Sequence, residues 1–263
     1  MISHQTISIE GQKAKVWIGG SGTPLVLLHG GFGNAQQHWR ATFTACAPHF
    51  HIIAPDLPGF GVSAPLAVPS YQSYLSWITV LFEMLGIGGP MLMMGNSFGA
   101  ALARLYAAAN TGEVDRLVLI DGGAIPEVAG CARSIFQIPI VTPLMLELAR
   151  RQSFSMGGLK KAVHVESILT PEFAENARAA SHGFVASMKQ IAINQLPSLR
   201  IPTCPTLIVW GEFDGLSSAA NGERLASTIP QAQFSLIKDA GHMPQIEQPQ
   251  AFHEVALKFL KSK

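Results

Sequence analysis

The sequence predicts an α/β protein with a doubly wound, mostly parallel sheet of eight strands. Over residues 24–120, short apolar runs alternate with amphipathic helical segments in the order strand, helix, strand, helix, strand. Glycine and polar residues follow these runs, and ligands of such sheets bind beyond the carboxyl ends of the strands. The chain has 263 residues, of which 48% are hydrophobic, so one large domain can bury both faces of the sheet.

The strands and helices can be assigned in chain order. Polar and apolar residues alternate over 6–9 and 13–18, which predicts a hairpin at one edge of the sheet. The six further strands are expected over residues 24–28, 50–54, 91–94, 115–120, 205–210 and 233–237. Helices are expected to follow residue 97 directly and to span residues 39–47, 71–85, 219–227 and 250–260.

A long helical stretch interrupts this order between the sixth and seventh strands. It carries scattered methionine and phenylalanine residues, and its basic residues outnumber the acidic ones. An apolar helical insertion at this place is typical of a lid over the carboxyl ends of the strands. The alternative is a helical subdomain that only enlarges the hydrophobic core. We therefore expect residues 1–124 and 201–263 to form the core and residues 125–200 to form a helical lid.

Charge and cysteine content argue against several classes of partner. The net charge is +1, which gives no electrostatic support for binding nucleic acid or a membrane surface. The three cysteines lack the spacing of a disulfide framework or a zinc site, and the sequence shows no apolar leader and no membrane-spanning apolar run. We expect a cytoplasmic protein that binds a small molecule and uses no metal or cofactor, and a homodimer stays open.

The motif with the most specific chemistry is Gly95-Asn96-Ser97-Phe98-Gly99, which lies between an apolar run and a helix. Serine in a tight strand-to-helix turn is strained and exposes its hydroxyl, and small residues on either side leave room for the strand and the helix. The N–H of Phe98 opens the helix and points at negative charge that forms beside Ser97. The motif therefore predicts a nucleophilic serine, and a serine that only caps the helix is the alternative.

Two other strand ends supply the partners that a serine nucleophile needs. Asp214 follows the seventh strand, and His242 follows the eighth. A serine hydroxyl needs a base to take its proton and a third group to orient that base. Asp121 follows the sixth strand and is a second candidate for the acid. His29 and Asp56, also at strand ends, are predicted to stabilise their own loops.

These motifs make the chain resemble the α/β-hydrolase fold family along nearly its whole length. The order Ser97, Asp214, His242 matches the order of that family. The resemblance implies that Ser97 is the nucleophile, that His242 is the general base and then the general acid, and that Asp214 orients His242. The matching segments are His29-Gly30-Gly31-Phe32-Gly33, Asp56-Leu57-Pro58-Gly59-Phe60-Gly61-Val62-Ser63, Gly95-Asn96-Ser97-Phe98-Gly99, Gly211-Glu212-Phe213-Asp214 and Gly241-His242.

The resemblance also implies an oxyanion hole, which binds the negative oxygen that forms during acyl transfer. One donor would be the N–H of Phe98, and the second would come from the loop after the first buried strand. Gly31 and Phe32 are the candidates for the second donor, and family members with this loop favour Gly31. Some members place the acid after the sixth strand, so Asp121 is the second candidate for the acid after Asp214.

The identity of the nucleophile narrows the reaction. Serine at position 97 argues against dehalogenase and epoxide hydrolase chemistry, whose relatives attack with a carboxylate. Serine implies acyl transfer through an acyl-enzyme, usually with water as the second acceptor. The first hypothesis is therefore a hydrolase of carboxylic esters, including lactones, with a small or medium apolar acyl group.

Three other functions stay open. The chain is similar to hydrolases that cleave carbon–carbon bonds in aromatic ring-fission products, in which Arg178 would bind a substrate carboxylate, although Met243 stands where those enzymes often have tryptophan. Cofactor-free perhydrolases and a non-catalytic receptor that binds a small molecule are the other two. The remaining histidines form no metal-ligand spacing, and most are expected at the surface: His4, His38, His49, His51, His164, His182 and His253.

Overall fold

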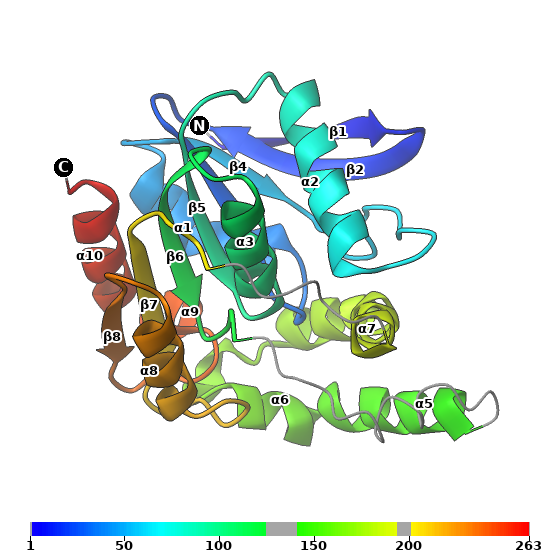
Figure 1. The fold of residues 1–263 in the computed structure, drawn as a ribbon. Helices are drawn as coiled ribbons and strands as arrows, with labels where there is room; N and C mark the ends of the chain where they lie inside the picture. Colours follow the sequence, from blue (N-terminus) through cyan, green and yellow to red (C-terminus); the bar gives the residue numbers. More distant parts are fainter. Residues whose placement is uncertain (1, 125–140, 194–200, 263) are drawn as a thin grey trace.

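The computed structural model describes residues 2–124, 141–193 and 201–262. Its eight strands form one sheet in the order β1-β2-β4-β3-β5-β6-β7-β8, as the sequence predicts for a mostly parallel doubly wound sheet (Figure 1). The strands are β1 (Ser3–Ile9), β2 (Gln12–Gly19), β3 (Pro24–Leu28), β4 (His51–Pro55), β5 (Met91–Asn96), β6 (Val114–Ile120), β7 (Thr206–Gly211) and β8 (Gln233–Ile237).

The direction of the strands changes only at one edge of the sheet. β1 pairs antiparallel with β2, and β2 pairs antiparallel with β4. From β4 onward every neighbouring pair is parallel, so the loops after these strands open at the same edge. The expected hairpin is confirmed, although β1 begins at Ser3, three residues before the expected start, and the six expected buried strands are confirmed to within two residues at each end.

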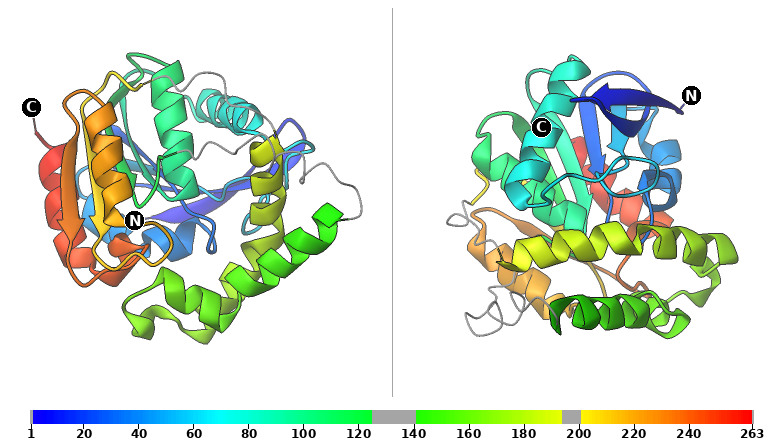
Figure 2. Two further views of the ribbon diagram at one scale, coloured as in Figure 1. Left: turned by 60° about the horizontal axis from the view of Figure 1, so that its bottom comes forward. Right: turned by 90° about the vertical axis from the view of Figure 1, so that its right-hand side faces the viewer.

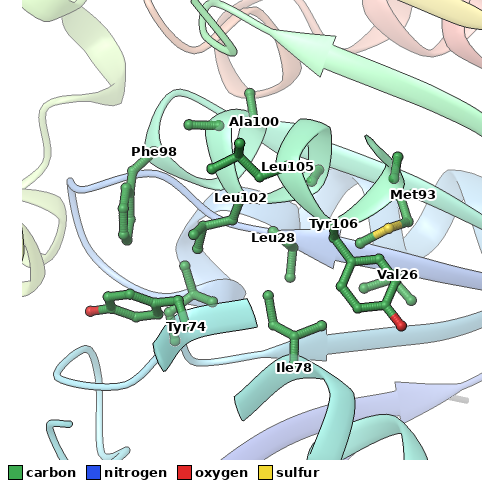
Figure 3. Close-up of a cluster of buried hydrophobic side chains, with 14 of the residues drawn as sticks. Val26, Leu28, Tyr74, Ile78, Met93, Phe98, Ala100, Leu102, Leu105 and Tyr106 are labelled. Atoms are coloured by element: carbon green, nitrogen blue, oxygen red, sulfur yellow. The ribbon is translucent and has the colours of Figure 1, made fainter. Parts of the chain in front are cut away.

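Helices cover both faces of the sheet because alternate residues of the buried strands point to opposite sides. One face packs Val26 and Leu28 against α2 (Tyr71–Met84), α3 (Phe98–Ala109) and α8 (Ala219–Thr228). The other face packs Leu25 and Leu27 against α1 (Ala35–Cys46) and α10 (Pro249–Leu260). Figure 3 shows the first of these clusters, where side chains of α2, α3 and the strands meet.

α3 is the most deeply buried helix of this core. Eleven of its twelve residues are buried, including Leu102 and Tyr106. Alanine makes up half of the helix, and the small side chains let α3 lie close against the centre of the sheet. The ring of Phe98 meets Tyr74 of α2 edge-on, with centroids 5.1 Å apart. This packing fixes the start of α3, where the serine motif lies.

A helical insertion separates β6 from β7, and its described part comprises residues 141–193. It contains α5 (Val141–Ser153), α6 (Met156–Ala162), a 3-10 turn (Glu166–Ile168) and α7 (Pro171–Ile193). Figures 1 and 2 show that these helices lie beyond the carboxyl ends of the parallel strands. The outer parts of the expected lid, 125–140 and 194–200, lie outside the described residues. None of the described helices has the length and apolar character needed to cross a bilayer.

Two helices differ from the sequence prediction. α1 begins at Ala35 rather than at residue 39, because the side chain of Asn34 caps it by accepting the N–H of Gln37 at 3.0 Å. A short helix, α9 (Pro244–Glu247), follows the loop of His242 and was not predicted. Proline at its first position suits a helix start, since that N–H needs no partner.

Candidate active site

Ser97 stands in the sharp turn between β5 and α3. Its backbone adopts φ 53° and ψ −111°, a left-handed conformation that is strained for a residue with a side chain. Gly95 and Gly99 flank it, and a Cβ on either would collide with the backbone of Gly99 or of Leu28, respectively. The N–H of Ser97 donates to the carbonyl of Ile120 at 2.8 Å, which fixes the turn on β6. The turn therefore has the strained geometry that presents a serine hydroxyl at the end of a sheet.

His242 and Asp214 are paired at the carboxyl ends of β8 and β7. His242 Nδ1 donates to Asp214 Oδ2 at 2.8 Å, and the two side chains are 5% and 0% exposed. The other oxygen of Asp214 accepts the N–H groups of Leu216 and Ser217. Burial raises the pKa of Asp214, but the hydrogen bond and charge of His242 and the two amides lower this pKa more, so the net shift is downward. Asp214 is therefore a carboxylate that holds the imidazole in one orientation.

Asn96 connects the serine turn to the histidine loop. Its Nδ2 donates to the carbonyl of His242 at 3.1 Å and to that of Ile120 at 3.2 Å. In the part of the chain that the structure describes, Ser97 Oγ makes no hydrogen bond of ordinary geometry with His242, and such bonds commonly tighten only when substrate binds. Because Nδ1 is engaged by Asp214, Nε2 is the ring nitrogen left to take a proton from the serine.

The loop after β3 lies beside the serine turn and carries Gly31 and Phe32. A Cβ on the glycine before Gly31 would lie 3.3 Å from the Cβ of Ser97. The ring of Phe32 meets the imidazole of His242 edge-on, with centroids 6.4 Å apart. Phe98 begins α3, where the first N–H groups have no carbonyl partner within the helix. The three residues predicted to form an oxyanion hole are thus gathered around the serine turn.

A comparison with known families shows to which family the chain belongs. Residues 25–255 match the model of the alpha/beta hydrolase family. This chain belongs to that family. The match covers the serine turn, the Asp214–His242 pair and the insertion of the alpha/beta hydrolase, and it agrees with the observed fold.

Individual relatives of this alpha/beta hydrolase include lipases, esterases and carbon–carbon bond hydrolases. Lipase 1 of Psychrobacter immobilis is 28% identical, and the match covers 86% of this chain and 73% of the lipase. The 2-hydroxy-6-oxononadienedioate/2-hydroxy-6-oxononatrienedioate hydrolase 2 of Pseudomonas putida is 29% identical, with 93% and 90% covered. A thermophilic esterase from Thermogutta terrifontis superposes with a TM-score of 0.76 at 26% identity, with 99% and 98% covered.

His29 holds the loop that follows β3 in the alpha/beta hydrolase, as the sequence predicts. Its Nδ1 lies 2.7 Å from the carbonyl of Gly30, and its Nε2 lies 2.9 Å from the N–H of Leu57. Because Nε2 accepts from an amide, the neutral tautomer must carry its proton on Nδ1. Burial lowers the pKa of His29 to about 4, so the ring is neutral at neutral pH.

His38 also holds this loop, although the sequence analysis expected it at the surface. It is 1% exposed on the inner side of α1, its Nε2 lies 3.1 Å from the carbonyl of Phe32, and its Nδ1 accepts the N–H of Gly30 at 3.5 Å. Burial, followed by the charge of His29, lowers the pKa of His38 to about 3. His253 is buried as well and bonds to Thr42 at 3.0 Å. Of the seven remaining histidines, His4, His49, His164 and His182 are exposed, so the expectation for most of them is confirmed, and His38 and His253 are the buried exceptions.

Asp121, the reserve acid, lies at the end of β6 and is 1% exposed. Its Oδ1 accepts the N–H of Gly211 at 2.9 Å, and its Oδ2 is buried without a partner among the described residues. One side-chain atom each of Asp121, Asp214 and His242 lies within 4.8 Å of the others. Asp214, and not Asp121, accepts the hydrogen bond of the imidazole, so the structure favours Asp214 as its partner.

Glu247 joins the histidine loop to the insertion, and the sequence analysis missed it. Its Oε2 accepts the N–H groups of His164, Val165 and Gly241 at 2.7–3.0 Å. Its Oε1 accepts that of Met243 at 3.1 Å. The N–H of His242 also donates to a carbonyl of the insertion, that of Ala162, at 2.7 Å. No local pattern signals this contact, because its partners lie more than 80 residues apart in the chain.

The insertion has an apolar core of its own that reaches the candidate site. Phe154, Leu159, Phe173 and Ala177 pack in one cluster with Phe32 and Met243. Phe184 of α7 lies over Gly31, where a Cβ would come within 2.5 Å of its ring. Arg178 is exposed on α7, beside this buried face rather than on it. The structure therefore gathers the predicted triad and oxyanion residues, but it does not bring Arg178 to them.

Proposed function

We propose that this alpha/beta hydrolase cleaves a carboxylic ester or lactone with a small or medium apolar acyl group, through an acyl-enzyme on Ser97. The observation that carries the proposal is the connection of three strand ends: Asp214 orients the imidazole of His242, and Asn96 ties the His242 loop to the serine turn. Such a connection supplies a base for the serine and an acid that stabilises the imidazolium. The lipase and esterase relatives support this reaction class.

In the first half of the reaction, Ser97 Oγ attacks the acyl carbon while its proton passes to His242 Nε2. The carbonyl oxygen becomes an oxyanion and accepts the N–H of Phe98 and a second N–H, first of all that of Gly31, with Phe32 as the other candidate. When the tetrahedral intermediate collapses, the carbon–oxygen bond to the leaving alcohol breaks. The imidazolium of His242 gives its proton to that alcohol.

In the second half, water replaces the alcohol. His242 takes a proton from the water, which attacks the acyl carbon of the ester on Ser97. The second tetrahedral intermediate expels the serine oxygen, which regains its proton from His242. Asp214 stays ionised throughout, because its hydrogen bonds to two amides and to the imidazole all favour the carboxylate.

Aromatic side chains around the serine turn support an apolar substrate. Phe184 lies against Gly31 and edge-on to Phe98 and Phe154, with centroids 6.4 and 6.0 Å apart. An acyl chain that enters beside the serine would therefore meet rings rather than charges. We propose that the insertion acts as a lid that supplies this apolar wall and excludes water.

Hydrolysis of a carbon–carbon bond is the second candidate. The observation in its favour is the Pseudomonas putida relative, which is named as a dienedioate hydrolase and is covered by the match over 90% of its length. The same Ser97, His242 and Asp214 would serve that reaction. Arg178, which was expected to bind a substrate carboxylate, is exposed, and this makes the ester reaction the better supported of the two.

Fluorophosphonate labelling followed by peptide mapping tests the nucleophile. Modification of Ser97, together with turnover of p-nitrophenyl esters that falls about 10⁶-fold in Ser97→Ala and in His242→Ala, is expected. Labelling at another residue would contradict the proposal, and binding of esters without turnover would favour a receptor. Parallel assays with esters, lactones and dienoate ring-fission products then separate the two hydrolase candidates.

A further inference from the structure

The strand ends of β6 and β7 place two buried aspartates against each other. Asp121 and Asp214 bring carboxylate oxygens within 4.8 Å, and both lie beside His242. Both carboxylates are largely buried, with relative exposures of 1% and 9% for the residues. Two negative charges this close in a buried place repel strongly, so one of the two groups is expected to hold a proton.

The hydrogen bonds decide which aspartate carries the charge. Asp214 accepts two backbone N–H groups on one oxygen and the imidazole on the other, so every partner favours its ionised form. Asp121 accepts a single N–H, from Gly211, on its Oδ1. Its Oδ2 is buried and finds no donor in the described part of the chain. A proton on Oδ2 would turn this unsatisfied acceptor into a donor, and the carboxylate of Asp214, which has an oxygen within 4.8 Å of an oxygen of Asp121, is an acceptor close by.

We propose that Asp121 is a neutral carboxylic acid that donates a hydrogen bond from Oδ2 to the carboxylate of Asp214. It is a positioning residue, because it acts through Asp214 rather than on the reacting atoms, and this role rests on the proposed function. The hydrogen bond ties the Asp214 side chain to the end of β6, in addition to the bonds that it accepts from the amides of Leu216 and Ser217. This additional bond restrains the Asp214 carboxylate from rotating away from the imidazole.

The electrostatic surroundings agree with this assignment. Burial raises the pKa of Asp121 well above its usual value, followed by the charge of Asp214, and the charge of Glu247 acts in the same direction. The N–H from Gly211 lowers this pKa, but its effect is smaller than that of burial and that of the Asp214 charge. The titratable groups that face Asp121 are therefore Asp214, His242 and Glu247, and the two carboxylates among them both disfavour its ionisation.

Three variants test the role of Asp121 in turnover. In Asp121→Asn, the amide nitrogen can donate to Asp214 while the amide oxygen accepts from Gly211, so this variant is expected to keep most of the kcat. Asp121→Ala removes the donor and should lower kcat about 10-fold or more with little change in KM. Asp115→Asn, an exposed aspartate at the opposite end of β6, is the matched control. If Asp121→Asn loses as much kcat as Asp121→Ala, the neutral-acid role is wrong.

Thermal unfolding tests the same proton without any substrate. Between pH 5 and pH 8, wild-type Asp121 would stay protonated in the native state and be ionised in the unfolded state. The native state then binds more protons, so the stability of the wild type falls with rising pH relative to Asp121→Asn. The Tm of Asp121→Asn minus that of the wild type should rise by about 3 °C or more over this range. A constant difference, or an Asp121→Asn protein that fails to fold, would overturn the proposal.

The two failures can be told apart. Loss of the proposed function would appear as the absence of Ser97 labelling, while the pH dependence of Tm in Asp121→Asn would be unaffected. Failure of the Asp121 proposal would appear as a constant Tm difference in a protein whose Ser97 is still labelled. Infrared spectra of the wild type at pH 7 give a third readout, since the carbonyl band of a buried neutral acid should disappear in Asp121→Asn.

Discussion

The loops at the carboxyl edge of the sheet and the helical insertion beyond them are stabilised by different interactions. In the loops, polar groups are fixed by named hydrogen bonds, as in the Asp214–His242 pair and the amide of Asn96. In the described part of the insertion, the side chains that pack near the serine turn are apolar, such as Phe154 and Phe184. Directional bonds fix angles, whereas apolar packing fixes shape. Under the proposed function, the difference assigns the chemistry to the sheet edge and the shape of the substrate space to the insertion.

The largest effect is expected for Asp214→Asn at the sheet edge. The asparagine oxygen would take the place of Oδ1 and accept the N–H groups of Leu216 and Ser217, so its NH2 group would donate to Nδ1. The imidazole would then carry its own proton on Nε2, which is the wrong tautomer, and kcat should fall about 10⁴-fold with the fold intact. Ester hydrolysis and circular dichroism measure the two parts of this expectation. A near-normal kcat in Asp214→Asn, with a large loss in Asp121→Asn, would mean that Asp121 is the acid.

Acid should weaken the sheet edge through its buried neutral histidines. Burial lowers the pKa of His29 to about 4 and that of His38 to about 3, whereas both have an ordinary value of 6.5 in the unfolded chain. Below pH 6.5 the unfolded state binds more protons than the native state. The free energy of unfolding should therefore fall by about 1.4 kcal/mol per pH unit for each histidine down to pH 4.

Urea unfolding at several pH values measures that slope. His38→Gln removes one titrating group and should reduce the slope between pH 6.5 and pH 4 by about 1.4 kcal/mol per pH unit. His182→Gln changes an exposed histidine of α7 and serves as the control. Equal slopes in His38→Gln and the wild type would show that His38 is not the neutral buried group described above.

A smaller effect is expected where the insertion touches the site. Phe184→Ala removes the ring over Gly31 and should raise KM for apolar esters about 10-fold while kcat changes little. Steady-state kinetics with a series of acyl lengths measures it. The matched change Leu148→Ala, at a residue 58% exposed on α5, should leave KM unaltered. A fall in kcat with constant KM in Phe184→Ala would mean that the insertion contributes to the chemical step, which would contradict the division between the sheet edge and the insertion.

The smallest effect is expected for Arg178→Ala on neutral esters, because its side chain is exposed on α7. We expect kcat/KM to change less than about 3-fold, as for a surface substitution. The informative measurement uses dienoates with a free carboxylate beside the neutral esters. A loss above 10-fold confined to the carboxylate substrates would revive Arg178 as a binding residue and favour carbon–carbon bond cleavage.

The sheet and the serine turn could be predicted from the sequence because their signals are local. Five consecutive residues around Ser97 specify the turn, and apolar runs specify the strands. The burial of His38 was not predicted, because the expected helix began at residue 39 and so left His38 outside it. Placing the start at Ala35, after the cap at Asn34, puts His38 on the same buried side as Trp39 and Thr42. A missed helix cap therefore hid a residue that holds the predicted oxyanion loop.

Other parts of the site depend on partners that are distant in the chain. The environment of Asp121 is set by Asp214, which lies in another loop, so no local pattern predicts its protonation. Arg178 is a different case, since it was chosen by resemblance rather than by helical spacing. The buried residues Phe173, Ala177 and Ala180 define the inner side of α7, and this spacing places Arg178 next to that side.

The four N–H groups on Glu247 have a consequence for protein engineering. The segment around Ala162–Val165 belongs to the insertion by sequence, yet it seats the backbone of the His242 loop. Exchange of the whole insertion with that of a relative would therefore alter the backbone support of His242, the proposed general base, together with the proposed substrate space. Chimeras that keep residues 161–165 and Glu247 as a fixed graft point, and exchange only α5 and α7, should change selectivity without disabling turnover.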